Sequence, residues 1–164
     1  MNAIVYTSNA GHSARYAAML GEMTGLPVFS LKDAIRHLDK GVPVIYAGWL
    51  CASMVMGYKK AARRFRVEAV AAVGLCDTGT GLEGVRKANG LAFDFPVFTL
   101  QGGMDKSRLK GVFKSMINVL IKVMNKKKNP TEDDQRMIWL LENDRDYVSE
   151  ENTADFMAWY HRQK

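Results

Sequence analysis

Short apolar runs alternate with helical segments along the first hundred residues, and this alternation constrains the fold more than any other feature of the sequence. Apolar runs of four to eight residues are typical of buried strands, whereas apolar residues spaced three and four apart are typical of amphipathic helices. Strands that alternate with helices form parallel sheets with helices on both faces. The pattern predicts strands at residues 2–7, 28–31, 42–47, 69–75 and 96–100.

The segments between these strands predict helices at residues 11–25, 33–38, 54–65 and 82–89. We expect right-handed crossovers and the doubly wound strand order 2-1-3-4-5. In that order, ligands bind at the carboxyl ends of the strands near strands one and three. The loops that follow Thr7, Ala47, Leu75 and Leu100 are therefore the expected site.

The last third of the chain is predicted to be helical. Residues 106–128 are expected to form one long helix, interrupted at most by Gly111, which Asn129 and Pro130 end. Thr131 is expected to cap the next helix and Ser149 the final one. A length of 164 residues fits a single domain, with a sheet core at 1–104 and a helical extension at 105–164.

The first loop, Ser8-Asn9-Ala10-Gly11-His12-Ser13, leads directly from a strand into a helix. The N-terminus of a helix presents unpaired backbone N–H groups and a partial positive charge, which together bind phosphate. Gly11 lets the backbone approach an anion closely, and Ser8 and Ser13 add hydroxyl donors. The loop matches neither the nucleotide-triphosphate pattern G-x-x-x-x-G-K-[ST] nor the dinucleotide pattern G-x-G-x-x-G. Alone it indicates an anion site or an ordinary turn.

This loop resembles the phosphate-loop motif of flavodoxins, [TS]-x-T-G-x-[TS]. Ser8, Gly11 and Ser13 match, His12 falls at the variable position, and Ala10 replaces the usual threonine and so removes one hydroxyl. Three further segments carry the resemblance: Gly48-Trp49-Leu50, Gly57-Tyr58-Lys59-Lys60-Ala61 and Leu100-Gln101-Gly102-Gly103-Met104-Asp105. They resemble a flavodoxin-like domain family that includes menaquinone-dependent protoporphyrinogen oxidase. The long basic and apolar helix after the fifth strand is similar to that oxidase and is absent from short-chain flavodoxins.

The resemblance implies a flavodoxin-like α/β fold that binds flavin mononucleotide (FMN). Trp49 is expected either to flank the flavin ring or to pack on a neighbouring helix. The residues expected to hold FMN are Ser8, Asn9, Ala10, Gly11, His12, Ser13, Gly48, Trp49, Leu50, Cys76, Thr78, Gly79, Gln101, Gly102 and Gly103. No catalytic side chain is expected, because FMN itself supplies the chemistry. No metal site is expected either, because too few histidines lie near the two cysteines.

Residues 106–128 combine lysines and arginines with apolar residues spaced three and four apart. One interpretation is a helix that covers the edge of the sheet with its cations in solvent. The other is a peripheral contact with an anionic membrane, whose head groups attract the lysines. Nucleic acid is disfavoured, because a net charge of +6 comes here with no nucleic-acid-binding motif.

The sequence leaves three functions open. The first is an FMN-dependent electron carrier or oxidoreductase that meets a redox partner protein or a quinone. The second is an enzyme like the menaquinone-linked oxidase, although little between the fourth and fifth strands would hold a tetrapyrrole. The third is a module that has lost its cofactor, at which Ala10 hints. Cys51 and Cys76 are expected to be reduced and largely buried, and the lack of a secretory signal favours the cytoplasm.

Overall fold

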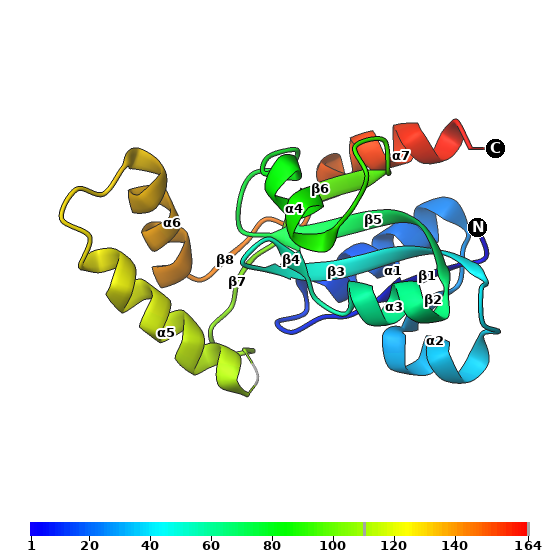
Figure 1. Cartoon of the computed structure of the whole chain (residues 1–164), viewed down its shortest axis with the longest axis horizontal. Coiled ribbons are helices and arrows are strands. Elements are labelled where there is room, and N and C mark those ends of the chain that lie inside the picture. Colours follow the sequence, from blue (N-terminus) through cyan, green and yellow to red (C-terminus); the bar gives the residue numbers. More distant parts are fainter. Residues whose placement is uncertain (110, 164) are drawn as a thin grey trace.

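The computed structural model describes residues 1–109 and 111–163, and its centre is a twisted sheet (Figure 1). Five strands lie in the order β2-β1-β3-β5-β6, and each neighbouring pair is parallel. Their bounds are β1 Ala3–Tyr6, β2 Val28–Ser30, β3 Pro43–Cys51, β5 Arg66–Gly74 and β6 Val97–Gln101. This is the predicted order 2-1-3-4-5, and the fold is a flavodoxin-like doubly wound α/β fold with extra C-terminal helices.

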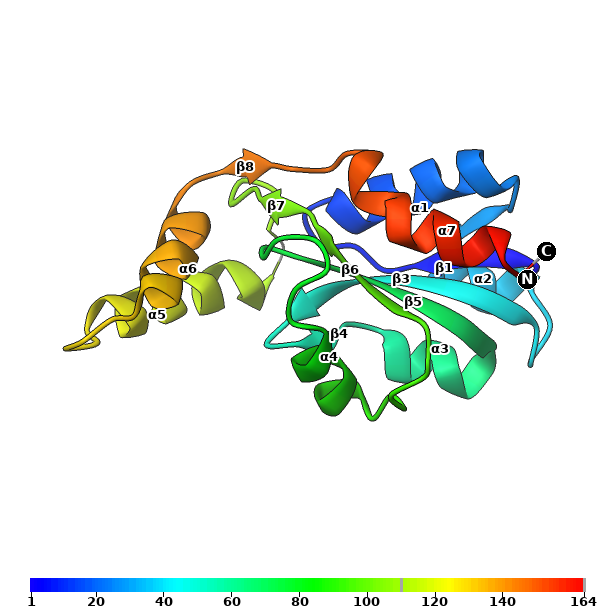
Figure 2. The ribbon, with the colours of Figure 1, turned by 90° about the horizontal axis from the view of Figure 1, so that it is seen from above.

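Helices cover both faces of this sheet (Figure 2). Helices α1 (His12–Thr24) and α7 (Ala154–His161) pack on one face, where Tyr16, Leu20 and Phe156 are fully buried. Helices α2 (Leu31–His37), α3 (Tyr58–Arg64) and α4 (Leu82–Asn89) pack on the other. Because both faces are buried, the central strands are continuously apolar rather than alternating.

Three short strands and one turn of 3-10 helix lie outside the five parallel strands. Strand β4 (Met54–Val55) pairs antiparallel with the end of β3, and β7 (Gly103–Met104) pairs antiparallel with β8 (Arg145–Asp146). The 3-10 turn η1 spans Glu151–Thr153.

The predicted end of the third strand and start of the next helix were wrong. Strand β3 continues past Gly48 to Cys51, and the chain then turns back into β4. Ala52 and Ser53 form this turn with φ of 47° and 64°, a left-handed conformation that few residues other than glycine adopt. The next helix was predicted from residue 54. Because this turn and β4 occupy the first residues of that segment, α3 begins only at Tyr58.

The predicted long helix at 106–128 was also wrong. Asp105 accepts hydrogen bonds from the backbone N–H groups of Ser107 and Arg108, which forms a turn instead of a helix. Helix α5 begins only at Val112, after Gly111 with φ of 61°, and ends at Asn125. Lys110, which the prediction included, lies outside the described residues.

Helix α6 (Glu132–Glu142) follows and forms a hairpin with α5 that projects from the sheet in both views (Figures 1 and 2). Thr131 caps α6, as predicted, and the structure adds a reciprocal capping box with Asp134. Ser149 caps no helix, because the final helical segment begins with η1 after Glu150. None of the helices in the described ranges is long and apolar enough to cross a membrane.

Candidate functional site

The predicted phosphate loop connects β1 to α1 at the carboxyl edge of the sheet. Gly11 is the N-terminal cap residue of α1 and has φ of 105°, which a residue with a side chain rarely adopts. The Ser8 hydroxyl accepts a hydrogen bond from the Gly11 N–H over 3.1 Å. Gly11 provides no side-chain cap, so the N–H groups of the first helical turn remain available to an acceptor.

Ser13 lies in this first turn and is only 1% exposed. Within the described ranges its Oγ has no hydrogen-bond partner. A buried hydroxyl without a partner costs about 1–3 kcal/mol, so native proteins seldom retain one without a ligand or water to meet it. This hydroxyl is a chemical feature of the loop that no other residue of the described ranges uses.

Charged side chains from the C-terminal extension surround the same loop. A cleft of about 360 Å³ lies between Ala10–His12, Arg15 and residues 104–105, 108 and 144–146. An Arg108 nitrogen lies 3.5 Å from the position where a Cβ at residue 11 would stand. Arg108 also pairs with Asp105 over 3.1 Å, and Arg15 pairs with Asp146. The extension therefore adds both cations, Arg108 and Arg145, and three carboxylates, Asp105, Asp144 and Asp146, to one side of the loop.

His12 begins α1 beside these charges. Burial lowers the pKa of His12 from 6.5, and the Asp146 carboxylate opposes this effect. The imidazole is therefore mainly neutral at pH 7 and can donate one hydrogen bond. Burial would raise the pKa of Asp146, but hydrogen bonds from Arg15 and the backbone of Val148 hold that pKa below its usual value.

The three predicted residues after strand three lie within β3 itself. A Cβ on Gly48 would stand 2.7 Å from Val55 Cγ1, so this glycine serves the packing of β4. Leu50 pairs with Val55 and packs over Gly74. Trp49 meets Phe113 of α5 edge to face, with the ring centroids 4.7 Å apart. Trp49 thus packs on helix α5, which was one of the two expectations for this side chain.

The predicted residues after β5 are tied to distant segments. The Thr78 hydroxyl donates to Asn152 Oδ1 over 2.8 Å and accepts from the Gln101 N–H over 2.9 Å. Gly79 donates its N–H to the Thr99 carbonyl. Cys76 is a free thiol, as is Cys51, but it is exposed, so its predicted burial was wrong. Burial of part of the thiol and the nearby Asp77 carboxylate raise the pKa of Cys76.

The predicted residues after β6 are the ones brought next to the first loop. A Cβ on Gly102 would stand 3.2 Å from His12 Cβ and 2.7 Å from Val73 Cγ1. A Cβ on Gly103 would stand 2.1 Å from the Arg145 carbonyl oxygen, so this glycine permits the pairing of β7 with β8. The Gln101 carbonyl accepts the Tyr16 hydroxyl over 2.6 Å.

Two residues that shape this edge of the sheet, Asn152 and Arg108, were not predicted as site residues from the sequence. Asn152 donates to the Tyr16 hydroxyl and to the Tyr147 carbonyl, both over 2.8 Å, while it accepts from Thr78. It thereby joins the ends of three segments that are far apart in the chain. Arg108 reaches the loop only because the predicted helix is a turn at that point. No local pattern marks either residue.

The structure thus brings the first loop together with Gly102 and Arg108, and Trp49 together with Phe113. Thr78 and Asp77 lie toward η1 and α6 through Asn152 and Arg136. No cluster of three or more metal-ligating side chains occurs among residues 1–109 and 111–163. The first loop offers the N–H donors of a helix N-terminus, with Arg108 beside them.

Comparison with known proteins adds no family to this fold. No family model matches the chain, and neither the curated proteins nor the solved structures yield a match.

Proposed function

We propose that this chain binds FMN at the carboxyl edge of its sheet and serves in electron transfer or flavin-dependent redox chemistry. The observation that carries the proposal is the buried Ser13 hydroxyl, which has no partner in the described part of the chain and lies in the first turn after Gly11. The phosphate of FMN is an acceptor of the kind that this hydroxyl and the N–H groups of the turn require.

The loop residues 8–13 would hold the phosphate, and Arg108 would add a cation at its outer side. Trp49 offers an aromatic surface near the next strand end, and Phe113 already contacts this ring edge to face. When bound, FMN supplies one- and two-electron chemistry. The chain's own contribution is to bind the phosphate, orient the ring and limit the access of water.

The test is a titration of the purified protein with FMN, followed by flavin fluorescence and by the visible spectrum. Ser13→Ala should weaken FMN binding about tenfold or more, because a hydrogen bond to a charged group contributes roughly 1.5–3 kcal/mol. Without FMN the same variant should be at least as stable as the parent, since it removes an unpaired buried hydroxyl.

Thr99→Val is the matched control. Its hydroxyl is also buried and without a partner among the described residues, but it lies within β6 and not in the first loop. This variant should keep FMN affinity. A colourless protein that binds no added FMN would exclude the proposal and favour a module without cofactor. Turnover of protoporphyrinogen with a quinone would identify the oxidase alternative.

A further inference from the structure

Helix α5 exposes a stripe of apolar side chains. Among the described residues, eight large apolar side chains are exposed, and five of these belong to α5: Val112, Met116, Val119, Leu120 and Val123. Val112 is 75% exposed and Val123 is 62% exposed. Their spacing of three and four places them on one side of the helix.

This stripe adjoins the side of α5 that packs on the protein. Phe113, Ile117, Ile121 and Met124 are half-buried and form that inner side, where Phe113 meets Trp49. No residue of α5 is fully buried. The helix therefore has one broad apolar face, of which the fold covers only a part. Exposed apolar patches of this kind mark interaction surfaces.

The charge of the segment that carries the stripe is of one sign. Residues 106–128 contain eight lysines and arginines and no aspartate or glutamate. Lys122 borders the stripe on α5, and Lys126 and Lys128 follow at its end. Lys127 forms a salt bridge with Asp134 of α6. An apolar stripe flanked by lysines matches a surface that is apolar within and anionic at its boundary.

We propose that α5 docks on the surface of a membrane rich in anionic phospholipid. The stripe enters the boundary between head groups and acyl chains, and the lysines pair with the lipid phosphates. The hairpin of α5 and α6 projects from the sheet (Figures 1 and 2). The helices that cover the sheet therefore leave room for a membrane surface beside α5.

A second copy of the chain fits this surface less well. In a two-fold contact the same patch meets itself, so the cations of one α5 would face those of the other. A bilayer supplies many anions and no cation cluster. The proposal does not rest on FMN, because none of its residues belongs to the first loop.

The experiment is co-sedimentation of the full chain with vesicles of phosphatidylcholine, with and without phosphatidylglycerol, at low and high salt. The chain should bind only the vesicles that contain phosphatidylglycerol, and salt should weaken this binding. Lys122→Gln with Lys126→Gln should reduce the partition about thirtyfold, since each lysine contributes about fivefold. Val119→Gln with Val123→Gln should reduce it about tenfold while preserving helix propensity.

Two control variants separate this surface from general stickiness. Phe93→Gln removes a side chain that is 94% exposed elsewhere, and Lys59→Gln with Lys60→Gln removes two exposed charges from α3. Both should bind vesicles as the parent does. Absence of binding to anionic vesicles, or equal losses in the controls, would overturn the proposal. A dimer in sedimentation analysis that Val119→Gln with Val123→Gln dissociates would also overturn it, in favour of a second copy.

Discussion

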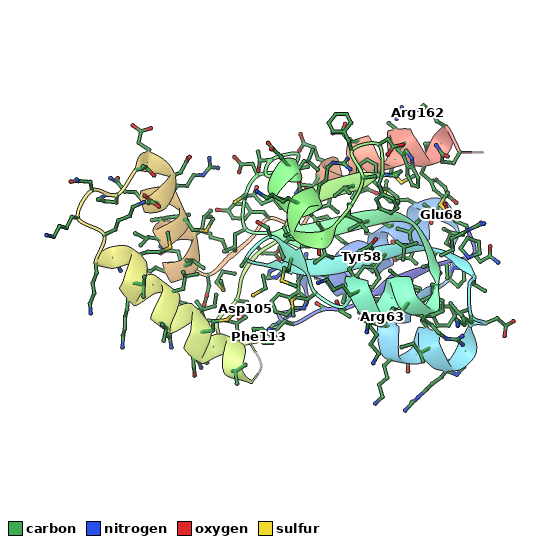
Figure 3. The ribbon with its side chains drawn as sticks, in the orientation of Figure 1. Tyr58, Arg63, Glu68, Asp105, Phe113 and Arg162 are labelled. Carbon is green, nitrogen blue, oxygen red and sulfur yellow. The ribbon has the colours of Figure 1, made fainter. Side chains whose placement is uncertain are left out.

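Trp49 of β3 and Phe113 of α5 meet edge to face, with ring centroids 4.7 Å apart and planes at 89°. This contact joins the carboxyl edge of the sheet to the first turn of the projecting hairpin, where Phe113 is labelled in Figure 3. Aromatic pairs in this geometry contribute about 0.5–1.5 kcal/mol beyond the area they bury. The pair is therefore the structural link between the proposed flavin edge and the proposed membrane surface.

Phe113→Ala should loosen the start of α5 without unfolding the sheet. The variant removes a half-buried ring from a helix that has no fully buried residue, so the loss falls on the hairpin. Limited proteolysis should cut residues 106–128 several times faster than in the parent, while the sheet keeps its circular dichroism signal. Val123→Ala on the exposed stripe should leave the cleavage rate unchanged. Equal rates in both variants would contradict the link.

Trp49→Ala should weaken FMN binding and change the fluorescence of the bound flavin. Trp49 is the aromatic side chain at the end of β3, and indole rings close to a flavin quench its emission. Flavin fluorescence in the presence of saturating protein is the measurement. Trp159→Ala removes an indole that packs with Phe98 and Phe156 on the α7 face and serves as the control. Unchanged flavin emission in Trp49→Ala would assign Trp49 to packing alone.

Gly11→Val should abolish FMN binding while the protein still folds. A β-branched residue at φ of 105° is strained by about 1–3 kcal/mol and would shift the loop. Gly25→Val is the matched control, because Gly25 also has a positive φ, of 73°, but it caps the opposite end of α1. Both variants should lose similar stability in urea unfolding, and only Gly11→Val should lose the flavin. Retained yellow colour in Gly11→Val would count against the site.

The sheet could be predicted from the sequence because its strands are buried on both faces. Val44–Ala47 and Ala69–Val73 are continuously apolar, and this pattern depends on burial alone. The strand order followed from the alternation with helices. The cap at Thr131 was also predictable, since the hydroxyl and Asp134 are three residues apart.

The site was less predictable because its contacts join distant segments. Left-handed φ at Ala52 and Ser53 leaves no mark in the composition, so the hairpin of β3 and β4 was missed and Trp49 was placed in a loop. The side chain of Asp105 stabilises a turn where a helix was predicted, and this turn brings Arg108 close to Gly11. Gly102 and Gly103 were predicted to hold FMN, and their neighbours in the structure are His12 and the β8 backbone.

Asn89→Ala should destabilise the protein by about 2–3 kcal/mol. The buried side chain accepts the Val55 N–H over 2.9 Å and donates to the carbonyls of Ser53 and Val85 over 2.9 and 2.7 Å. Its removal leaves buried backbone groups of the β3–β4 hairpin without partners. Urea unfolding measures the loss, and Asn118→Ala on the exposed side of α5 should change stability by less than about 0.5 kcal/mol. Similar losses in the two variants would refute this role for Asn89.

The neutral form of His12 should make the stability of the ligand-free protein fall at mildly acidic pH. The pKa of His12 is lowered from 6.5 by burial, so the unfolded chain binds a proton at a pH where the folded chain does not. Stability due to this group is therefore complete above pH 6.5 and is lost as the pH falls through the lower, folded pKa. Urea unfolding between about pH 7.5 and pH 5 should show this slope, and His12→Gln should reduce it.

In the FMN complex the phosphate would stand beside His12 and favour the imidazolium, so saturating FMN should raise the pKa that NMR measures for His12. A pKa that FMN leaves unchanged would place the phosphate away from this loop.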